Sequence, residues 1–593
     1  RGQPIAASAS TAPNEVAVLA LVSDVDAWMA RPDVLPGFVI GKAAPRRWVV
    51  TGRLPVARVE AVRADPNLRS LKAGTPLHPM LAAGVREVGA VDAQGRPVGR
   101  SDGVVVGIVD FGCDFAHENF RTGTGSRVLA IWDQTAAADP QAEVPYGRVH
   151  RRPAIELALT MPDPYLALGY GPARDTPFAR GSHGTHVMDI AAGNGRGSGV
   201  AGMAPEADIL FVEVSAEDVP WSGEEVVGTT FGDSVQLLEA MRWIFDEAGE
   251  RPCVINVSLG TNGGPHDGTT PVEQGIDAMV RERPNRAVVI AASNCYDDHV
   301  HAMGRVAPGE PFDLGWIVAD TPAAQAEVEI WYAGNDRLEL ELVDPEGVSV
   351  ARVAPGQQGR LRDTGTGQTV IFLASRLGDP NNGDNVIGAY LERGLAAGTW
   401  TLRLHNPGQK PVAFHAWIER NDGGQSSFTG PAVSDDFTLG SISCGRDSVV
   451  VGSYDAHKPT TPLSWFSSAG PTRDGREKPE VSAPGHEVLA AHSRTGRGVV
   501  RKSGTSMAAP MVTGALAMVL AEARRQGVDL DIDRLRHLVM ATGRPAASGS
   551  GWDSRYGHGK LSVAAMLQQL SDAPKVAAAS GRRQRRRTSS RSA

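Results

Sequence analysis

The chain has 593 residues, a length that favours two to four folding units. Hydrophobic residues make up 41% of it and charged residues 21%, a composition that excludes a wholly disordered protein. The formal net charge of −8 argues against a general nucleic-acid binder. No run of about 18 uninterrupted apolar residues occurs, so the sequence predicts no membrane-spanning helix.

The N-terminal region has the pattern of a small α+β unit, for which we set the bounds 1–82. After a small, polar lead-in, strand-like runs start at Val16 and Arg47, with a segment of mixed character between them up to Gly41. Apolar residues at helical spacing from Val56 predict a helix that ends before Pro66. A further strand is expected near Leu68.

A different pattern begins near residue 102. Continuous apolar runs alternate with helical stretches such as 233–248, which predicts a doubly wound α/β layer with a parallel sheet. We assign 83–302 and 432–572 to the two parts of this layer. The runs are GVVVGIVD (103–110), ADILFVEV (207–214), CVINVSLG (253–260), AVVIAASN (287–294) and SVVVGSY (448–454).

Between these two parts the sequence alternates apolar and polar residues in short runs separated by Gly, Pro, Asn and Asp. VEIWYAG, TVIFLAS and GTWTLRLHN are examples. Six or more short strands at this spacing predict an antiparallel β-sandwich inserted at 303–431. Insertion at a surface loop costs little closure entropy, so this arrangement is physically reasonable.

The cysteines and the two ends of the chain carry little functional signal. Cys113, Cys253, Cys295 and Cys444 lie far apart without a CxxC pair, so we interpret them as small buried residues rather than disulfide or zinc ligands. Arg1 is not followed by an apolar signal region, which suggests a processed or trimmed N-terminus and leaves secreted, cell-envelope and cytoplasmic locations all open. The Arg-rich segment 573–593 is expected to be a disordered tail, the alternative being an anchor for an anionic surface.

Three local motifs place reactive side chains where open α/β sheets carry their sites. Asp110 ends a strand in IVDFG, His183 opens a helical run in SHGTHV, and Ser506 begins an apolar helix in SGTSMAAP. Each has a simpler interpretation: the acid as a turn or cap residue, the histidine as a cap or metal ligand, the serine as an N-cap. Together, acid, imidazole and hydroxyl are the set required for nucleophilic acyl transfer.

With these motifs in this order, the sequence resembles the subtilisin-like serine proteases, the subtilase family. The resemblance implies that Asp110, His183 and Ser506 form the catalytic triad. It also implies an oxyanion hole made by the side chain of Asn294 and the backbone N–H of Ser506. The family usually has glycine before this asparagine, where the chain has Ser293, so the local backbone is expected to differ.

Further segments match the family. Ser258, Leu259 and Gly260 correspond to the edge that binds an extended substrate by β-strand addition, the alternative being an ordinary buried strand and turn. His186, the second histidine of HGTH, matches a structural position. The family's frequent calcium loop reads GNGRGSGV here, and Arg196 within it weakens the case for a cation. We therefore assign no metal ligand and expect no required cofactor, and a structural calcium ion elsewhere stays open.

The two additional units have counterparts among subtilases. Residues 1–82 resemble a propeptide that assists folding and blocks the cleft until it is cut, with the cut expected between residues 75 and 95. The alternative is a permanent accessory domain. The inserted sandwich resembles the jelly-roll insertion of the Csp-type clostridial subtilases, on the segment VEIWYAGNDRLELELVDPEG.

The resemblance therefore implies a serine endopeptidase that acts through an acyl-enzyme and processes its own inhibitory propeptide. Its partners would be an extended polypeptide substrate and its own N-terminal unit, without nucleic acid. The alternative from another class is a catalytically silent, propeptide-plugged scaffold that binds proteins. A non-peptidase acyl hydrolase is disfavoured because GTSMAAP lacks the GxSxG elbow.

Overall fold

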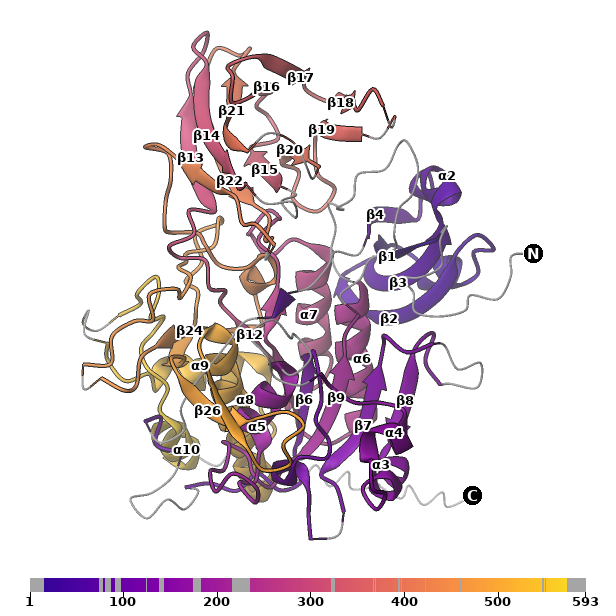
Figure 1. Ribbon diagram of the computed structural model, residues 1–593, viewed down its shortest axis with the longest axis vertical. Coiled ribbons are helices and arrows are strands. Elements are labelled where there is room, and N and C mark those ends of the chain that lie inside the picture. Colours follow the sequence, from indigo (N-terminus) through magenta and orange to yellow (C-terminus); the bar gives the residue numbers. More distant parts are fainter. Residues whose placement is uncertain are drawn as a thin grey trace, which may run out of the picture.

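The structure is a computed structural model, shown as a ribbon in Figure 1. The predictions for residues 1–14 and for the tail 573–593 lie outside its described residues. The described residues are 15–73, 78–79, 87–90, 98–123, 125–137, 143–173, 183–215, 235–320, 326–365, 367, 369–392, 395, 397–421, 423–458, 460–546, 549 and 551–572.

The N-terminal unit is a four-stranded antiparallel sheet with strand order β2-β3-β1-β4. The mixed segment before Gly41 contains a helix and a strand that the sequence pattern did not reveal. This strand, β2, pairs with β3 through several register shifts, which disrupt the alternation on which strand prediction depends. The elements are β1 (Glu15–Val22), α1 (Val25–Met29), β2 (Leu35–Ala44), β3 (Arg47–Pro55), the 3₁₀ turn η1 (Val56–Arg58), α2 (Val59–Arg63) and β4 (Leu68–Ala73).

An eight-stranded sheet forms the centre of the molecule, in the order β25-β24-β12-β10-β6-β9-β7-β8. Its strands run parallel except β8, which pairs antiparallel with β7. The apolar runs in the sequence correspond to its inner strands, which are almost wholly buried, as expected for a sheet covered on both faces. The strands are β6 (Val105–Asp110), β7 (Val128–Asp133), β8 (Arg148–Arg151), β9 (Asp208–Glu213), β10 (Cys253–Val257), β12 (Arg286–Ala291), β24 (Val449–Tyr454) and β25 (Val481–Pro484).

Helices cover this sheet on both sides (Figure 1). One layer contains α5 (His183–Ala192) packed on α8 (Thr505–Gln526), and the other contains α6 (Val235–Ala248) beside α7 (Pro271–Glu282). These α/β layers confirm the expected doubly wound, subtilisin-like class of fold. The remaining elements are the turns η2 (Glu118–Phe120) and η4 (Ser441–Cys444), the hairpin β26 (Val488–Ala491) and β27 (Val499–Lys502), and the helices α3 (Arg152–Ala158), α4 (Pro164–Leu168), α9 (Ile532–Ala541) and α10 (Val563–Asp572).

Helix α8 is long and apolar enough, by length and composition, to cross a membrane. However, 94% of its apolar window is buried inside the protein, where it packs on α5 and on the strands of the central sheet. It is therefore the core helix of the α/β layer. All four cysteines are also buried and free, as the sequence predicted.

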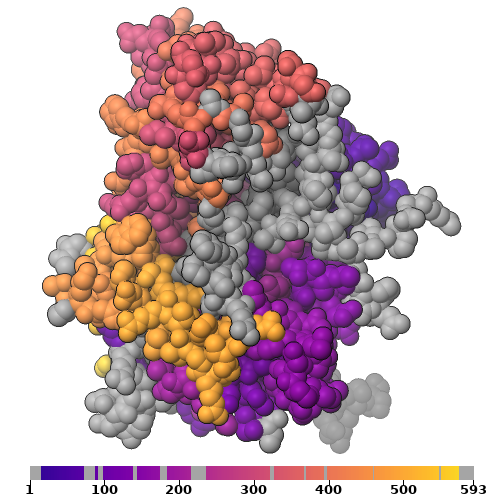
Figure 2. Space-filling view, in the orientation of Figure 1, coloured from indigo at the N-terminus to yellow at the C-terminus, as the bar shows by residue number. Residues whose placement is uncertain are grey.

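The inserted module consists of two packed antiparallel sheets, one of six strands and one of five, as the sequence pattern predicted. It stands above the α/β layer in the view of Figure 2. The sheets have the orders β13-β22-β15-β20-β19-β18 and β17-β16-β21-β14-β23, and their inner faces share one hydrophobic core. The strands are β13 (His301–Val306), β14 (Phe312–Val318), β15 (Ala326–Tyr332), β16 (Glu339–Val343), β17 (Ser349–Val353), β18 (Gln358–Arg362), β19 (Thr369–Arg376), β20 (Asn385–Leu391), β21 (Gly398–His405), β22 (Val412–Ile418) and β23 (Ser427–Thr429).

The N-terminal unit is joined to the α/β layer by a buried ion pair as well as by apolar contacts. Arg53 on β3 contacts both carboxylate oxygens of Glu239 on α6, at 2.6 and 2.8 Å. Tyr146 donates a further hydrogen bond to Glu239, at 2.7 Å, and its ring lies under the guanidinium of Arg53. Because removing one partner would leave a buried charge unpaired, this network couples the two units strongly.

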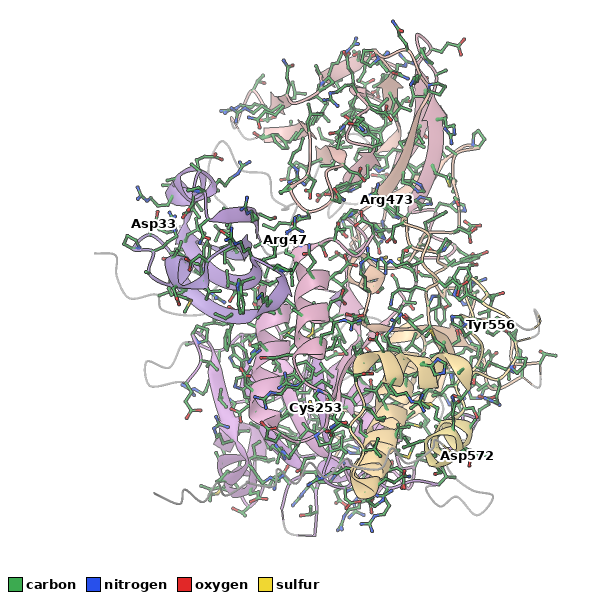
Figure 3. All side chains as sticks on the ribbon, turned by 180° about the vertical axis from the view of Figure 1, so that it is seen from behind. Asp33, Arg47, Cys253, Arg473, Tyr556 and Asp572 are labelled. Atoms are coloured by element: carbon green, nitrogen blue, oxygen red, sulfur yellow. The ribbon has the colours of Figure 1, made fainter. Side chains whose placement is uncertain are left out.

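The insert meets the α/β layer through a stack of buried aromatic rings. His266, from the loop that precedes α7, stacks on Trp417 of β22 with ring centroids 4.1 Å apart. His301 on β13 lies 3.0 Å from His415 on β22, nitrogen to nitrogen. Arg473, labelled in Figure 3, bridges the same junction by pairing with Asp267 and with Asp384 of the insert.

These histidines make the stability of the junction depend on pH. Burial lowers the pKa of His266 to about 3, and it lowers the pKa of His415 to about 4. In the unfolded chain both would titrate near about 6.5, so below that pH the unfolded state binds protons that the folded state does not. The free energy of unfolding therefore loses up to about 1.4 kcal/mol per histidine per pH unit, between about pH 6.5 and 4.

We expect His266→Gln to reduce this pH dependence. Urea unfolding at pH 7 and at pH 5 gives the change in the free energy of unfolding for wild type and for the variant. The carboxylates contribute equally to both proteins, so the difference between the two changes reports on His266. The matched control is His405→Gln, because His405, at the end of β21, is paired with Glu341 instead of with the rings of the junction. Equal pH slopes for wild type and His266→Gln would contradict the prediction.

Candidate active site

Asp110 and His183 are brought together at the carboxyl end of β6. The Nδ1 atom of His183, the first residue of α5, lies 2.6 Å from Oδ1 of Asp110. A carboxylate oxygen can only accept, so Nδ1 carries the proton, and in the neutral ring Nε2 is left as the basic nitrogen. Asp110 is fully buried and His183 is 3% exposed, so their interaction is largely shielded from water.

Backbone contacts fix the start of α5 against the end of β6. The N–H of Gly184 donates to the carbonyl of Phe111 at 2.6 Å, and the hydroxyl of Thr185 donates to the carbonyl of Gly112 at 2.8 Å. The position of His183 is therefore set by these contacts between the end of β6 and the start of α5, and not by the ion pair alone.

A second acid lies beside Asp110, on the neighbouring strand of the sheet. Glu213 ends β9 and is the register partner of Asp110 on β6. Its Oε2 accepts hydrogen bonds from the hydroxyl of Tyr170 and from the N–H of Gly112, both at 2.7 Å. Burial raises the pKa of Glu213 to about 8, so at neutral pH this carboxyl is mostly protonated and adds little negative charge beside Asp110. The strand-end position of Glu213 was the signal that sequence reasoning overlooked.

Ser506 lies in the first turn of α8, buried at the helix N-terminus. The N-cap, Gly504, has φ 149°, a conformation that favours glycine, as expected from the tight turn in SGTS. The hydroxyl of Ser506 donates to the carbonyl of Ser258 at 3.3 Å, and the hydroxyl of Ser258 donates back to the carbonyl of Ser506 at 2.7 Å. The serine is thus held against the segment between β10 and the next strand.

Asn294 is oriented by the residue that precedes Ser506. Its Oδ1 accepts from the backbone N–H of Thr505 at 2.7 Å and from the hydroxyl of Thr505 at 3.0 Å. Since the carbonyl end of the amide accepts in this way, the Nδ2 end is the one that can donate. Sequence reasoning identified Asn294 but not Thr505, although Thr505 belongs to the same GTSMAAP motif.

The serine that replaces the usual glycine before Asn294 adopts an unusual backbone conformation. Ser293 has φ 94°, in a region that non-glycine residues rarely occupy. The backbone at Ser293 is therefore strained, at a cost of order 1–3 kcal/mol. The N–H of Ser468 donates to the carbonyl of Ser293 at 3.1 Å and helps to hold the backbone in place.

A short segment of the N-terminal region pairs with the predicted substrate-binding strand. The strand β5 (His78–Pro79) runs antiparallel to β11 (Leu259–Gly260), with Pro79 opposite Leu259 and His78 opposite Gly260. β11 is therefore able to accept an added strand, and an extended piece of this same chain occupies it.

His186 is held away from these groups. Its Nε2 lies 3.2 Å from the carbonyl of Val488 and 3.1 Å from that of Val500, so the ring ties α5 to the hairpin β26–β27. This contact supports the structural role that the resemblance implied.

In the loop after α5, side-chain oxygens accept hydrogen bonds from backbone N–H groups. The side chain of Asn194 accepts from the N–H of Arg196, and the side chain of Asn119 accepts from Gly197 and Ser198. The loop offers no carboxylate, so it gives no support to a calcium ion there. Within the described ranges, no three His, Cys, Asp or Glu side chains are grouped to hold a metal.

The family model of the peptidase S8 subtilases matches residues 101–311 and 406–559, more than half of the chain. The chain belongs to the subtilase family. This subtilase is similar to the C5a peptidase of Streptococcus pyogenes, 24% identical over 479 residues, which cover 75% of the chain and 37% of that protein. It therefore spans a little over a third of the length of that relative.

Other relatives agree with the family assignment. Serine protease AprX of Bacillus subtilis is 31% identical over 121 residues, which cover 18% of this subtilase and 26% of AprX. The CspB protease of Clostridium perfringens superposes with a TM-score of 0.66 at 23% identity, covering 80% of this chain and 94% of CspB. This superposition confirms the predicted similarity of fold to the Csp-type subtilases. Membership of the subtilase family supports a serine peptidase that acts on polypeptides.

Proposed function

We propose that this subtilase is a serine endopeptidase in which Asp110, His183 and Ser506 form the catalytic triad. The observation that carries the proposal is the buried 2.6 Å contact between Asp110 and His183, which sets the tautomer a general base requires. Nε2 of His183 takes the proton of the Ser506 hydroxyl as its oxygen attacks the substrate carbonyl. His183 then donates this proton to the leaving amine, and water hydrolyses the acyl-enzyme.

The tetrahedral oxyanion is stabilised, in this proposal, by the side-chain amide of Asn294 and the backbone N–H of Ser506. The contact of Thr505 with Oδ1 of Asn294 supports this role, because it leaves Nδ2 to donate. Substrate lies extended along residues 258–260 and adds a strand to β11. The pairing of β5 with β11 supports this binding mode.

We also propose that the N-terminal unit, about 1–82, is an inhibitory propeptide that the enzyme cuts from itself. The catalytic domain would comprise 83–302 and 432–572, with the sandwich 303–431 inserted between them. A strand of the N-terminal region on β11 supports the inhibitory role, since a substrate needs the same edge. The cut is then expected shortly after Pro79, and the released piece to have a mass of roughly 8–10 kDa for roughly 80 residues.

Fluorophosphonate labelling tests the proposed nucleophile. We expect the protein, once its N-terminal unit has been cut, to gain one covalent adduct, and peptide mapping to find it on Ser506, because only a serine activated by a neighbouring base reacts readily. Denatured protein is the control and should remain unlabelled. An adduct on another serine would contradict the assignment.

The occupied edge of β11 also favours a second candidate, a silent scaffold whose cleft stays plugged. In that case the native full chain would resist the label and keep its N-terminal unit. Intact mass after labelling separates the two candidates in one measurement.

A further inference from the structure

The N–H groups of the turn that follows Asp110 all donate to side chains. This turn, residues 111–114, leads from the end of β6 toward η2, and its shape depends on the acceptors that surround it. The four bonds run from Phe111 to Oδ1 of Asp110 at 2.7 Å, from Gly112 to Oε2 of Glu213 at 2.7 Å, from Cys113 to the hydroxyl of Tyr170 at 2.9 Å and from Asp114 to the hydroxyl of Thr185 at 2.8 Å.

Glu213 and Tyr170 supply two of these acceptors and are joined to each other. Tyr170 lies just after α4, and its hydroxyl donates to Oε2 of Glu213 at 2.7 Å while its oxygen accepts from Cys113. The tyrosine ring is buried and lies against the rings of Phe115 and His150, with centroids 6.4 and 5.7 Å away. The pair therefore presents two fixed acceptors to the turn.

The carbonyl groups of the same turn support the start of α5. The carbonyl of Phe111 accepts from the N–H of Gly184 at 2.6 Å, and the carbonyl of Gly112 accepts from the hydroxyl of Thr185 at 2.8 Å. These two donors directly follow His183 in the sequence. A displaced turn would therefore displace His183, and a misplacement of about 1 Å can lower a rate by about 10²-fold.

We infer that Glu213 and Tyr170 are positioning residues for His183, an inference that rests on the proposed function. They act through the 111–114 turn, which they hold against the start of α5. Glu213 has a second effect, because it is the register partner of Asp110 on the neighbouring strand. Its charge acts on the same histidine that the turn positions.

Glu213 changes its charge just above neutral pH. Desolvation raises its pKa to about 8, and the neighbouring aspartates add to this rise. Desolvation also holds the pKa values of the adjacent thiol and phenol well above their ordinary range and lowers that of the adjacent imidazole, so these three groups keep their charge between about pH 7 and 9. The titratable groups that face Glu213 or its tyrosine partner are Asp110, Asp133, Cys113, Tyr170 and His150.

Ionisation of Glu213 is expected to favour proton transfer to His183. Well below about pH 8 the carboxyl is protonated and neutral, whereas above this pH it adds a second negative charge beside Asp110. This charge stabilises the imidazolium that forms while the serine is deprotonated. The reactivity of Ser506 should therefore increase by about threefold to tenfold as the pH rises through this range.

The test measures how fast a fluorophosphonate labels Ser506 in protein whose N-terminal unit has been cut. Rates over a range of probe concentrations separate the maximal labelling rate, which depends on His183, from the half-saturating concentration, which reports on binding. Tyr170→Phe and Glu213→Leu should lower the maximal rate by about tenfold to a hundredfold and leave the half-saturating concentration within about twofold. Glu213→Gln keeps an oxygen that can accept both bonds, so at pH 7 it should label within about threefold of wild type.

The pH profile reports an effect that a merely structural role would not produce. The ratio of the maximal rates of wild type and Glu213→Gln should be constant below about pH 7, and it should rise by about threefold to tenfold between about pH 7 and 9, because glutamine cannot ionise. A ratio that stays flat over this range would overturn the inference. Labelling of Glu213→Leu and Tyr170→Phe as fast as wild type would also overturn it.

Tyr165→Phe is the matched control. Tyr165 also lies against Phe115 and donates its hydroxyl to an acid, Oδ1 of Asp114 at 2.7 Å, but its hydroxyl is not one of the four acceptors of the turn. This variant should label within about twofold of wild type, with the same pH dependence. Thermal unfolding monitors the fold of every variant. If Glu213→Leu does not fold, Tyr170→Phe and the pH profile of Glu213→Gln still decide the question.

The same labelling experiment separates a failure of the inference from a failure of the proposed function. If wild type gains no label on Ser506, the proposed function itself fails. If wild type is labelled but the variants at Glu213 and Tyr170 match it at every pH, only the positioning role is wrong. A Glu213→Gln variant that neither releases its N-terminal unit nor takes the label, although wild type does both, would also contradict the inference, because glutamine retains the acceptor.

Discussion

Replacing Ser506 with alanine is expected to abolish both peptide hydrolysis and release of the N-terminal unit. The hydroxyl is the only nucleophile in the proposed mechanism, and loss of a triad serine lowers kcat by about 10⁶-fold. Its neighbours on α8 are fully buried and unaffected by removal of one oxygen, so the fold should persist. Intact mass of purified wild type and variant, together with peptide turnover, measures both effects.

Ser503→Ala is the control for this experiment. Ser503 lies three residues earlier in the same motif, and its hydroxyl oxygen accepts a hydrogen bond from the N–H of Glu487. It should be processed and should cut peptides within a few-fold of wild type. If Ser506→Ala retained turnover, Ser506 could not be the nucleophile. If wild type stayed uncut but still took the fluorophosphonate label, only the proposed self-processing would be wrong.

Replacing Asp110 with asparagine is expected to lower kcat by about 10⁴-fold at neutral pH, with the fold intact. An asparagine amide can donate to Nδ1 of His183, which favours the tautomer with the proton on Nε2 and leaves no base facing the serine. The substitution also removes the charge that stabilises the imidazolium during proton transfer. Steady-state kinetics measures the loss, and circular dichroism with thermal unfolding monitors the fold.

Asp133→Asn provides a matched comparison. Asp133 is also a buried acid at the carboxyl end of a strand of the same sheet, but it accepts from the hydroxyl and N–H of Thr135 rather than from a histidine. Activity of this variant should stay within a few-fold of wild type. If both variants lose activity equally, strand-end acids act through stability and the specific role of Asp110 is not supported.

Local patterns in the sequence determined the class of fold and the residues of the candidate site. A continuous apolar run such as 253–257 identifies a strand buried on both faces, because only a covered parallel sheet tolerates apolar residues on both sides. The motifs around Asp110, His183, Asn294 and Ser506 could be recognised because each combines a reactive side chain with the strand end, turn or helix start that positions it. Alternation of polar and apolar residues likewise revealed the inserted antiparallel sheets.

Contacts between distant segments could be decided only by the tertiary structure. Glu213 looks like any strand-end acid until the β6–β9 register sets it beside Asp110 and burial raises its pKa to about 8. Strand β2 was missed because its register shifts break the alternation, and the ion pair of Arg53 with Glu239 joins residues 186 positions apart.

The same holds for a pocket beside Asn294. Arg420 follows Asn294 by more than a hundred residues, and both line one pocket only because of how the sandwich packs on the α/β layer. A sequence records which side chains are available and what local backbone they prefer. Burial, register and the meeting of charges depend on packing over the whole chain, so they become visible only when the chain is folded.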